Sequence, residues 1–135
     1  MATLPSTGLE LDVVYLTTGG QRDWYISDAL KAMNNVEYVS KGHGRVLRYH
    51  FIVDGNPLPP SLLCKGSMAS RIYTHHIEHA PGSTKALHER LQSTASGPGS
   101  QYLWKNLVHE LLPAGLKRCV LLDADLFLFS GLADL

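Results

Sequence analysis

The hydrophobic and polar positions of the chain fall into two alternating patterns. Short runs of apolar and β-branched residues predict buried strands at 11–17, 46–53, 71–77 and 119–122. Apolar residues three and four positions apart predict helices at 22–33, 84–91 and 102–112. Because strands that alternate with helices pack as one open sheet, these patterns predict an α/β fold with a mostly parallel sheet and right-handed crossovers.

Turn-forming residues set the predicted ends of these elements. Asn34-Asn35 predicts the end of the first helix, and Ser83 is the expected N-terminal cap of the second. Residues 58–70 fit neither pattern, and 93–100 is a loop rich in Gly and Ser. A length of 135 residues corresponds to one domain or part of one.

An Asp-x-Asp triplet directly after the last apolar strand is the most informative motif. Asp123 and Asp125 either share a face or flank a sharp turn. Two carboxylates this close repel each other, and a divalent cation such as Mg²⁺, Mn²⁺ or Ca²⁺ relieves that repulsion. The alternative is an ordinary turn in which the aspartates cap backbone N–H groups.

The position of this triplet in the predicted sheet matters for function. In open α/β sheets, ligands bind outside the carboxyl ends of the strands. Residues 17–20 and 123–125 both follow strands, so the topology can bring them together. The sequence has neither a Walker loop nor a Gly-x-Gly-x-x-Gly fingerprint, which disfavours an ATPase or a dinucleotide-dependent dehydrogenase.

Charge and cysteine content exclude other classes. Twelve basic and twelve acidic residues give a formal net charge of zero, so we expect no nucleic-acid partner. We also expect no membrane segment, because no apolar run is long enough to span a bilayer. The two cysteines, Cys64 and Cys119, lack metal-type spacing and do not form a disulfide framework. Cys119 lies in the apolar run and is expected to be buried.

Several segments resemble, in the same order, those of the family 8 glycosyltransferases, which include glycogenin and the Golgi xylosyl- and glucuronyltransferases. The similar segments are 14–19, 48–54, 102–107, 111–118, 122–125 and 131–135. The resemblance implies a GT-A fold, which is a Rossmann-like, mostly parallel sheet with flanking helices, truncated after the Asp-x-Asp strand. Residues 11–135 are then the amino-terminal, nucleotide-sugar-binding part of a glycosyltransferase domain, and residues 1–10 a disordered segment.

The resemblance also implies a function, that of a retaining glycosyltransferase with a UDP-sugar donor and a glycan or protein acceptor. Asp123 and Asp125 would hold Mn²⁺ or Mg²⁺, and Lys105 would be the catalytic cation near the sugar or diphosphate. The implied donor-binding residues are Leu16, Thr18, Gly19, Tyr25, Lys105, Asp123, Ala124 and Asp125. Trp24 is the alternative to Tyr25 for stacking on uracil. The analogy places the protein in the Golgi or endoplasmic reticulum lumen, with the cytoplasm as the alternative.

One departure from the family pattern concerns the metal. The family supplies a third ligand, a histidine in a His-x-x-Gly-x-x-Lys segment after the Asp-x-Asp, and this sequence contains no such segment. We therefore expect the chain alone to be inactive, because two carboxylates fix a metal poorly. A non-catalytic remnant that binds a nucleotide or a partner is the alternative.

Other residues have less specific interpretations. A haloacid-dehalogenase-like phosphatase also uses Asp-x-Asp, but Leu126-Phe127 follows here in place of the small polar pair of that class. His75 and His79 have helical zinc spacing, yet a solvated strand edge is the favoured interpretation. Asp12 is interpreted as a strand-start residue, Asp54 as a turn former, Lys105 by itself as a surface lysine, and Tyr102 and Trp104 as core residues.

Overall fold

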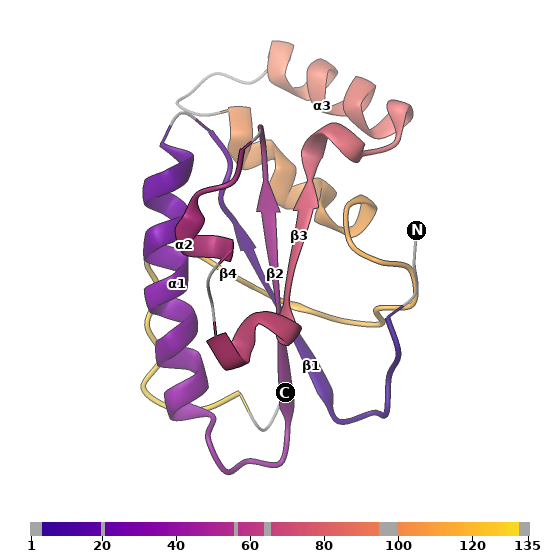
Figure 1. Ribbon diagram of the computed structural model, residues 1–135. Coiled ribbons are helices and arrows are strands. Elements are labelled where there is room, and N and C mark those ends of the chain that lie inside the picture. Colours follow the sequence, from indigo (N-terminus) through magenta and orange to yellow (C-terminus); the bar gives the residue numbers. More distant parts are fainter. Residues whose placement is uncertain (1–3, 20, 56, 64–65, 95–99, 133–135) are drawn as a thin grey trace.

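In the part of the chain that the structure describes, four parallel strands form a sheet at the centre of the fold (Figure 1). The computed structural model describes residues 4–19, 21–55, 57–63, 66–94 and 100–132. The strands are β1 (Glu10–Leu16), β2 (Val46–Val53), β3 (Ile72–His76) and β4 (Val120–Leu122). They lie in the order β3-β2-β1-β4, and each adjacent pair is parallel. The predicted α/β class and parallel sheet are confirmed.

Helices and 3₁₀ turns cover both faces of the sheet (Figure 1). The helices are α1 (Arg22–Val39), α2 (Pro60–Leu63) and α3 (Gly82–Thr94). The 3₁₀ segments are η1 (Gly66–Arg71), η2 (Ile77–His79) and η3 (Ser100–Glu110). α1 packs on one face, and η3, which contacts α3, packs on the other. Within the described residues, no helix is both long and apolar enough to cross a membrane.

The alternation of side chains along β1 and β2 divides the core into two layers. Val13 and Tyr15 of β1 face α1, where they pack with Met33. Val14 and Ile52 point to the opposite face and pack with the buried residues of η3. A parallel sheet covered on both faces explains why these strands are nearly continuous hydrophobic runs.

The last strand departs from the prediction because it lies at the edge of the described sheet. β4 begins at Val120 and pairs with β1. Cys119, expected to be buried in the strand, is exposed just before it, and Leu121 is exposed as well. The predicted fully buried strand is therefore wrong, since an edge strand has a neighbour on one side only.

All three predicted helices differ from their expected bounds, and the one expected at 102–112 is the 3₁₀ segment η3 (Ser100–Glu110). α1 continues through Asn34-Asn35 to Val39, because Val36 is buried in the core. The side chain of Asn35 donates a hydrogen bond to the Leu128 carbonyl (3.1 Å) and accepts one from the Leu128 N–H (2.7 Å). These contacts stabilise a helix that the asparagines would otherwise end. α3 begins at Gly82, so Ser83 lies in its first turn and does not cap it.

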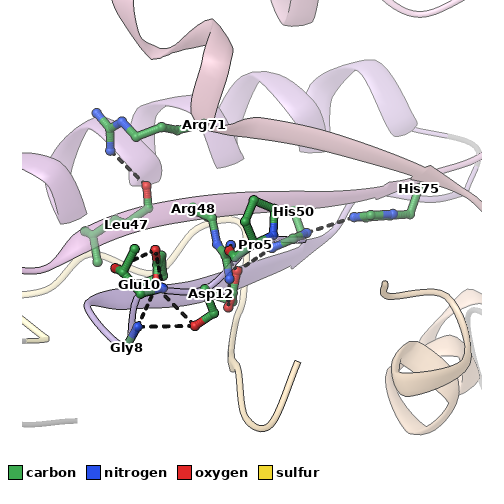
Figure 2. A network of polar contacts seen from close by, with 11 residues as sticks. Pro5, Gly8, Glu10, Asp12, Leu47, Arg48, His50, Arg71 and His75 are labelled. Carbon is green, nitrogen blue, oxygen red and sulfur yellow. Dashed lines mark hydrogen bonds and ion pairs between the residues drawn. The ribbon is translucent and has the colours of Figure 1, made fainter. Parts of the chain in front are cut away.

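The residues before β1 are tied to the sheet by polar contacts (Figure 2). β1 begins at Glu10, one residue before the expected domain boundary. The Glu10 carboxylate accepts hydrogen bonds from the N–H groups of Thr7 and Gly8. Arg48 of β2 donates to the carbonyl of Pro5 at 2.7 Å. The carbonyl of Pro5 is therefore held against β2 by Arg48, which belongs to the buried polar side of that strand.

Candidate functional site

A pocket lies where the chain changes direction across the sheet. From β1 the chain passes through α1 to β2 on one side, and it later returns to place β4 on the other side. The crevice outside the carboxyl ends of β1 and β4 is therefore a topological switch point, where α/β sheets bind ligands. The pocket there has a volume of about 240 Å³ and is lined by Leu16, Thr18, Tyr25, Asp28, Lys105, Asp123, Ala124 and Asp125.

The end of β1 places a buried polar atom without a hydrogen-bond partner in a residue of the pocket wall. Thr17 is fixed to β2, because both its N–H and its hydroxyl donate to the Ile52 carbonyl at 2.9 Å. This anchor directs the next residue, Thr18, into the pocket wall, where it is only 3% exposed. The Thr18 hydroxyl is buried without a hydrogen-bond partner among the described residues. Since a buried hydroxyl without a partner is unfavourable, a bound ligand would stabilise it.

The Asp-x-Asp triplet forms a turn at the carboxyl end of β4. The N–H of Leu126 donates to the Asp123 carbonyl at 3.1 Å and closes the turn. The register pairs Leu122 with Tyr15, which places the turn level with the end of β1. Both carboxylates line the pocket and are exposed to solvent. Of the two geometries considered from the sequence, the sharp turn is the one observed.

Lys105 brings a positive charge from η3 to this turn. Its Nζ atom lies 2.6 Å from Oδ1 of Asp123. η3 is anchored by buried neighbours of Lys105: Trp104 stacks on His88 at a ring separation of 4.3 Å, and Leu107 packs in the core. The buried Trp104 agrees with the predicted core role, whereas the side chain of Tyr102 lies outside the described residues.

The structure brings seven of the eight predicted donor-binding residues to the pocket, and Gly19 is the exception. Gly19 donates its N–H to the Asp54 carboxylate at 3.0 Å and lines a neighbouring, open hollow of about 660 Å³. Trp24 also lines that hollow, so of the two candidate aromatic residues Tyr25 is the one in the pocket. The roles of these residues in donor binding stay predictions.

Asp28 is a pocket residue that the sequence interpretation missed. It lies on α1 three residues after Tyr25, so the two side chains share a helix face. Its carboxylate is 3.9 Å from the Lys31 ammonium, a partly exposed and weak ion pair. The spacing from Tyr25 is the signal that could have identified it. The pocket lining that the structure describes therefore has three carboxylates and one ammonium group.

The donor atoms suit a cation that is shared with a ligand. Among the described residues, no three His, Cys, Asp or Glu side chains are grouped so that they could hold a metal ion. Asp123 and Asp125 offer hard oxygen atoms on one turn. Mg²⁺, and by the same chemistry Mn²⁺, is commonly held by one or two carboxylates together with substrate phosphates. The residues present therefore fit such a cation, with further ligands from a phosphate group and water.

A buried polar network crosses the sheet on the η3 side (Figure 2). The Asp12 carboxylate accepts two hydrogen bonds from Arg48 and one from Nε2 of His50, all at 2.8 Å. Nδ1 of His50 lies 2.8 Å from Nε2 of His75. A carboxylate can only accept, so a neutral His50 donates to Asp12 and accepts from His75. The interpretation of Asp12 as a simple strand-start residue is wrong.

Burial and hydrogen bonding in this network shift the pKa values of Asp12 and His75. Burial raises the pKa of Asp12, but the hydrogen bonds from His50 and Arg48 more than offset it and leave the pKa below its ordinary value. Burial is the main cause that lowers the pKa of His75 to about 4, and the electrostatic effect of its neighbours His50 and His76 adds to it. His75 is thus part of the network, and the expected solvated strand edge is wrong for this residue.

Comparison with known proteins defines the fold. Neither a family model nor a curated protein matches the chain. The solved structure of mouse xyloside xylosyltransferase 1, in its apo form, is similar with a TM-score of 0.60 and 16% sequence identity. The similarity covers 93% of this chain and 47% of that protein, so the chain spans about half of its length.

The class that this likeness defines is a glycosyltransferase-like α/β fold of the GT-A type. The predicted GT-A architecture is therefore confirmed at the level of the fold. Membership of family 8 stays a prediction from the sequence motifs.

Proposed function

We propose that this chain is the nucleotide-sugar-binding part of a glycosyltransferase that uses a UDP-sugar donor and a divalent cation. The observation that carries the proposal is the pocket at the β1–β4 switch point, which gathers Asp123, Asp125 and Lys105. The likeness to a xylosyltransferase fold supports it independently. The same likeness favours a transferase over the phosphatase alternative.

The pocket residues offer contacts of two kinds, charged groups for a diphosphate with its cation and groups suited to a nucleoside. Asp123 and Asp125 would hold Mn²⁺ or Mg²⁺, which when bound offsets the negative charge that develops on the leaving diphosphate. Lys105 contributes a second positive charge to the diphosphate or the sugar. For the nucleoside, Tyr25 is the aromatic residue of the lining that would stack on uracil, and the Thr18 hydroxyl would donate a hydrogen bond.

The charge of the pocket explains why a cation is needed. Three carboxylates and one ammonium group leave the lining net negative at neutral pH. Such a lining repels a diphosphate, and a divalent cation reverses that repulsion. Binding of UDP should therefore depend on the cation. The name of the structural neighbour makes UDP-xylose the first donor to test and a glycan the first acceptor class.

Calorimetric titration of UDP into the chain tests this proposal, with Mn²⁺ present in one series and EDTA in the other. We expect binding in Mn²⁺ and a loss of about tenfold or more in EDTA, since a contact to a charged group contributes about 1.5–3 kcal/mol. Asp123→Asn should weaken binding in Mn²⁺ by a similar factor. Glu89→Gln removes an exposed carboxylate from α3 and is the matched control.

Equal affinity in Mn²⁺ and EDTA, or an Asp123→Asn variant that binds as the wild type does, would contradict the proposal. A second measurement, UDP release from UDP-xylose with a xyloside acceptor, addresses catalysis. We expect binding without turnover, because two carboxylates leave the metal poorly fixed. Turnover by the chain would overturn that expectation while leaving the binding proposal intact.

A further inference from the structure

Lys105 and Asp123 form a close ion pair inside the candidate pocket. The separation of 2.6 Å between Nζ and Oδ1 is at the short end for a charge-assisted hydrogen bond. The lysine side chain is 34% exposed and the aspartate 62%, so both remain accessible to small solutes. One of the two carboxylates that would hold a metal ion is therefore already engaged by a cation of the protein.

A divalent cation and the Lys105 ammonium compete for the same oxygen atoms. A cation such as Mg²⁺ binds carboxylate oxygen at about 2.0–2.1 Å, which would bring it within a few ångströms of the ammonium nitrogen. Two positive charges at that separation repel each other. Metal binding to Asp123 therefore has to move the ammonium group away from its present position.

The structure lets the ammonium group move without moving the helix that holds it. Trp104 and Leu107, on either side of Lys105 in sequence, are buried in the core, so the backbone of η3 is fixed. The lysine side chain has four flexible carbon atoms and can swing about that fixed point. An ammonium displaced from Asp123 stays at the pocket wall, where an anionic ligand can bind it.

We propose that Lys105 is an internal counter-ion of Asp123 that the divalent cation displaces, and that the displacement couples cation binding to binding of the ligand's diphosphate. The inference rests on the proposed function, because it assumes that the pocket takes a cation and a nucleotide. Without ligands, Lys105 lowers the affinity of Asp123 for the cation. Once displaced, the same ammonium adds to the affinity for phosphate, and by reciprocity each ligand promotes binding of the other.

The test measures binding of Mn²⁺ alone, by electron paramagnetic resonance of the free ion, to the wild type and to Lys105→Met. We expect the variant to bind Mn²⁺ roughly three- to tenfold more tightly, because a competing positive charge is removed. Lys105→Arg keeps the charge and should stay close to the wild type. Lys85→Met removes an exposed lysine of α3 that does not line the pocket and should leave Mn²⁺ affinity unchanged.

The coupling is measured by titrating UDP with and without Mn²⁺. We expect Mn²⁺ to raise UDP affinity by a smaller factor in Lys105→Met than in the wild type. Unchanged or weaker Mn²⁺ binding by Lys105→Met would overturn the inference, since Lys105 would then only position Asp123 or contact the ligand. If the wild type nevertheless binds UDP in a Mn²⁺-dependent way, the proposed function is still supported and only the role of Lys105 as a counter-ion is refuted. If the wild type binds neither ligand, both fail.

Discussion

The buried ion pair between Asp12 and Arg48 allows a sharp test of what stabilises the sheet. Asp12→Asn keeps the size of the side chain but removes its charge. Arg48, which is 8% exposed, then remains buried without a counter-ion. Asp12→Asn combined with Arg48→Met removes both charges. We therefore expect the single variant to be less stable than the double variant, although the double variant has lost more polar contacts.

The size of the effect follows from the geometry. Asp12 is 6% exposed and accepts three hydrogen bonds of 2.8 Å, two from Arg48 and one from His50. Breaking a buried ion pair by removing one partner costs about 3–5 kcal/mol. Small domains have a total stability of about 5–15 kcal/mol, so this is a large fraction. The corresponding fall in melting temperature is on the order of 10–20 °C. The double variant should recover about 1–3 kcal/mol of the loss.

Urea unfolding followed by far-ultraviolet circular dichroism at pH 7 measures these differences. Asp23→Asn is the matched control, because Asp23 forms an ion pair with Arg22 but is 71% exposed. We expect the control to change the free energy of unfolding by less than about 0.5 kcal/mol. The reasoning is refuted if Asp12→Asn is as mild as the control, or if adding Arg48→Met lowers stability further.

Two further predictions concern acid stability and packing. Because burial lowers the folded-state pKa of His75 from 6.5 to about 4, the unfolded chain binds more protons between these values, and stability falls as the pH drops through that window. His75→Gln should flatten urea midpoints measured from pH 7 to pH 4, and an unchanged profile would count against this. Gly131→Ala should cost about 1–3 kcal/mol, because a Cβ there would lie 2.7 Å from the Val39 carbonyl oxygen. Gly82→Ala, with nothing within 4 Å, is the control, and equal urea midpoints for the two variants would contradict the packing argument.

The strands and the meeting of their carboxyl ends could be predicted from the sequence. β2 has the predicted bounds, Val46–Val53, because most of its residues are apolar or aromatic and the strand is buried on both faces, although it also carries Arg48 and His50. Crossover rules then limit where the next strands can lie. The proximity of Thr18 and Asp123 follows from that topology. It can be predicted without knowing the contacts between the segments that follow β1 and β4.

Features that depend on long-range contacts could not be predicted in this way. The length of α1 depends on Asn35, whose partner Leu128 is 93 residues away in sequence. The exposure of Cys119 depends on the edge position of β4, which the apolar run does not encode. Asp12 and Arg48 lie in two different apolar runs, and only the register between β1 and β2 shows that they are neighbours. Local patterns contain none of this information.

The network and the pocket lie at opposite ends of β1, and Leu16 is the residue of β1 that lines the pocket. Side chains alternate along a strand, so Asp12, Val14 and Leu16 all face η3, and Asp12 and Leu16 are about 13 Å apart along the backbone. Val14 lies between them in an apolar layer with Trp104. The network therefore fixes the register of β1 against β2 without contributing an atom to the pocket. It follows that Asp12→Asn should lower the stability of the fold while leaving the Mn²⁺ affinity of the folded protein nearly unchanged. Asp123→Asn should instead lower the Mn²⁺ affinity while leaving the stability of the fold nearly unchanged.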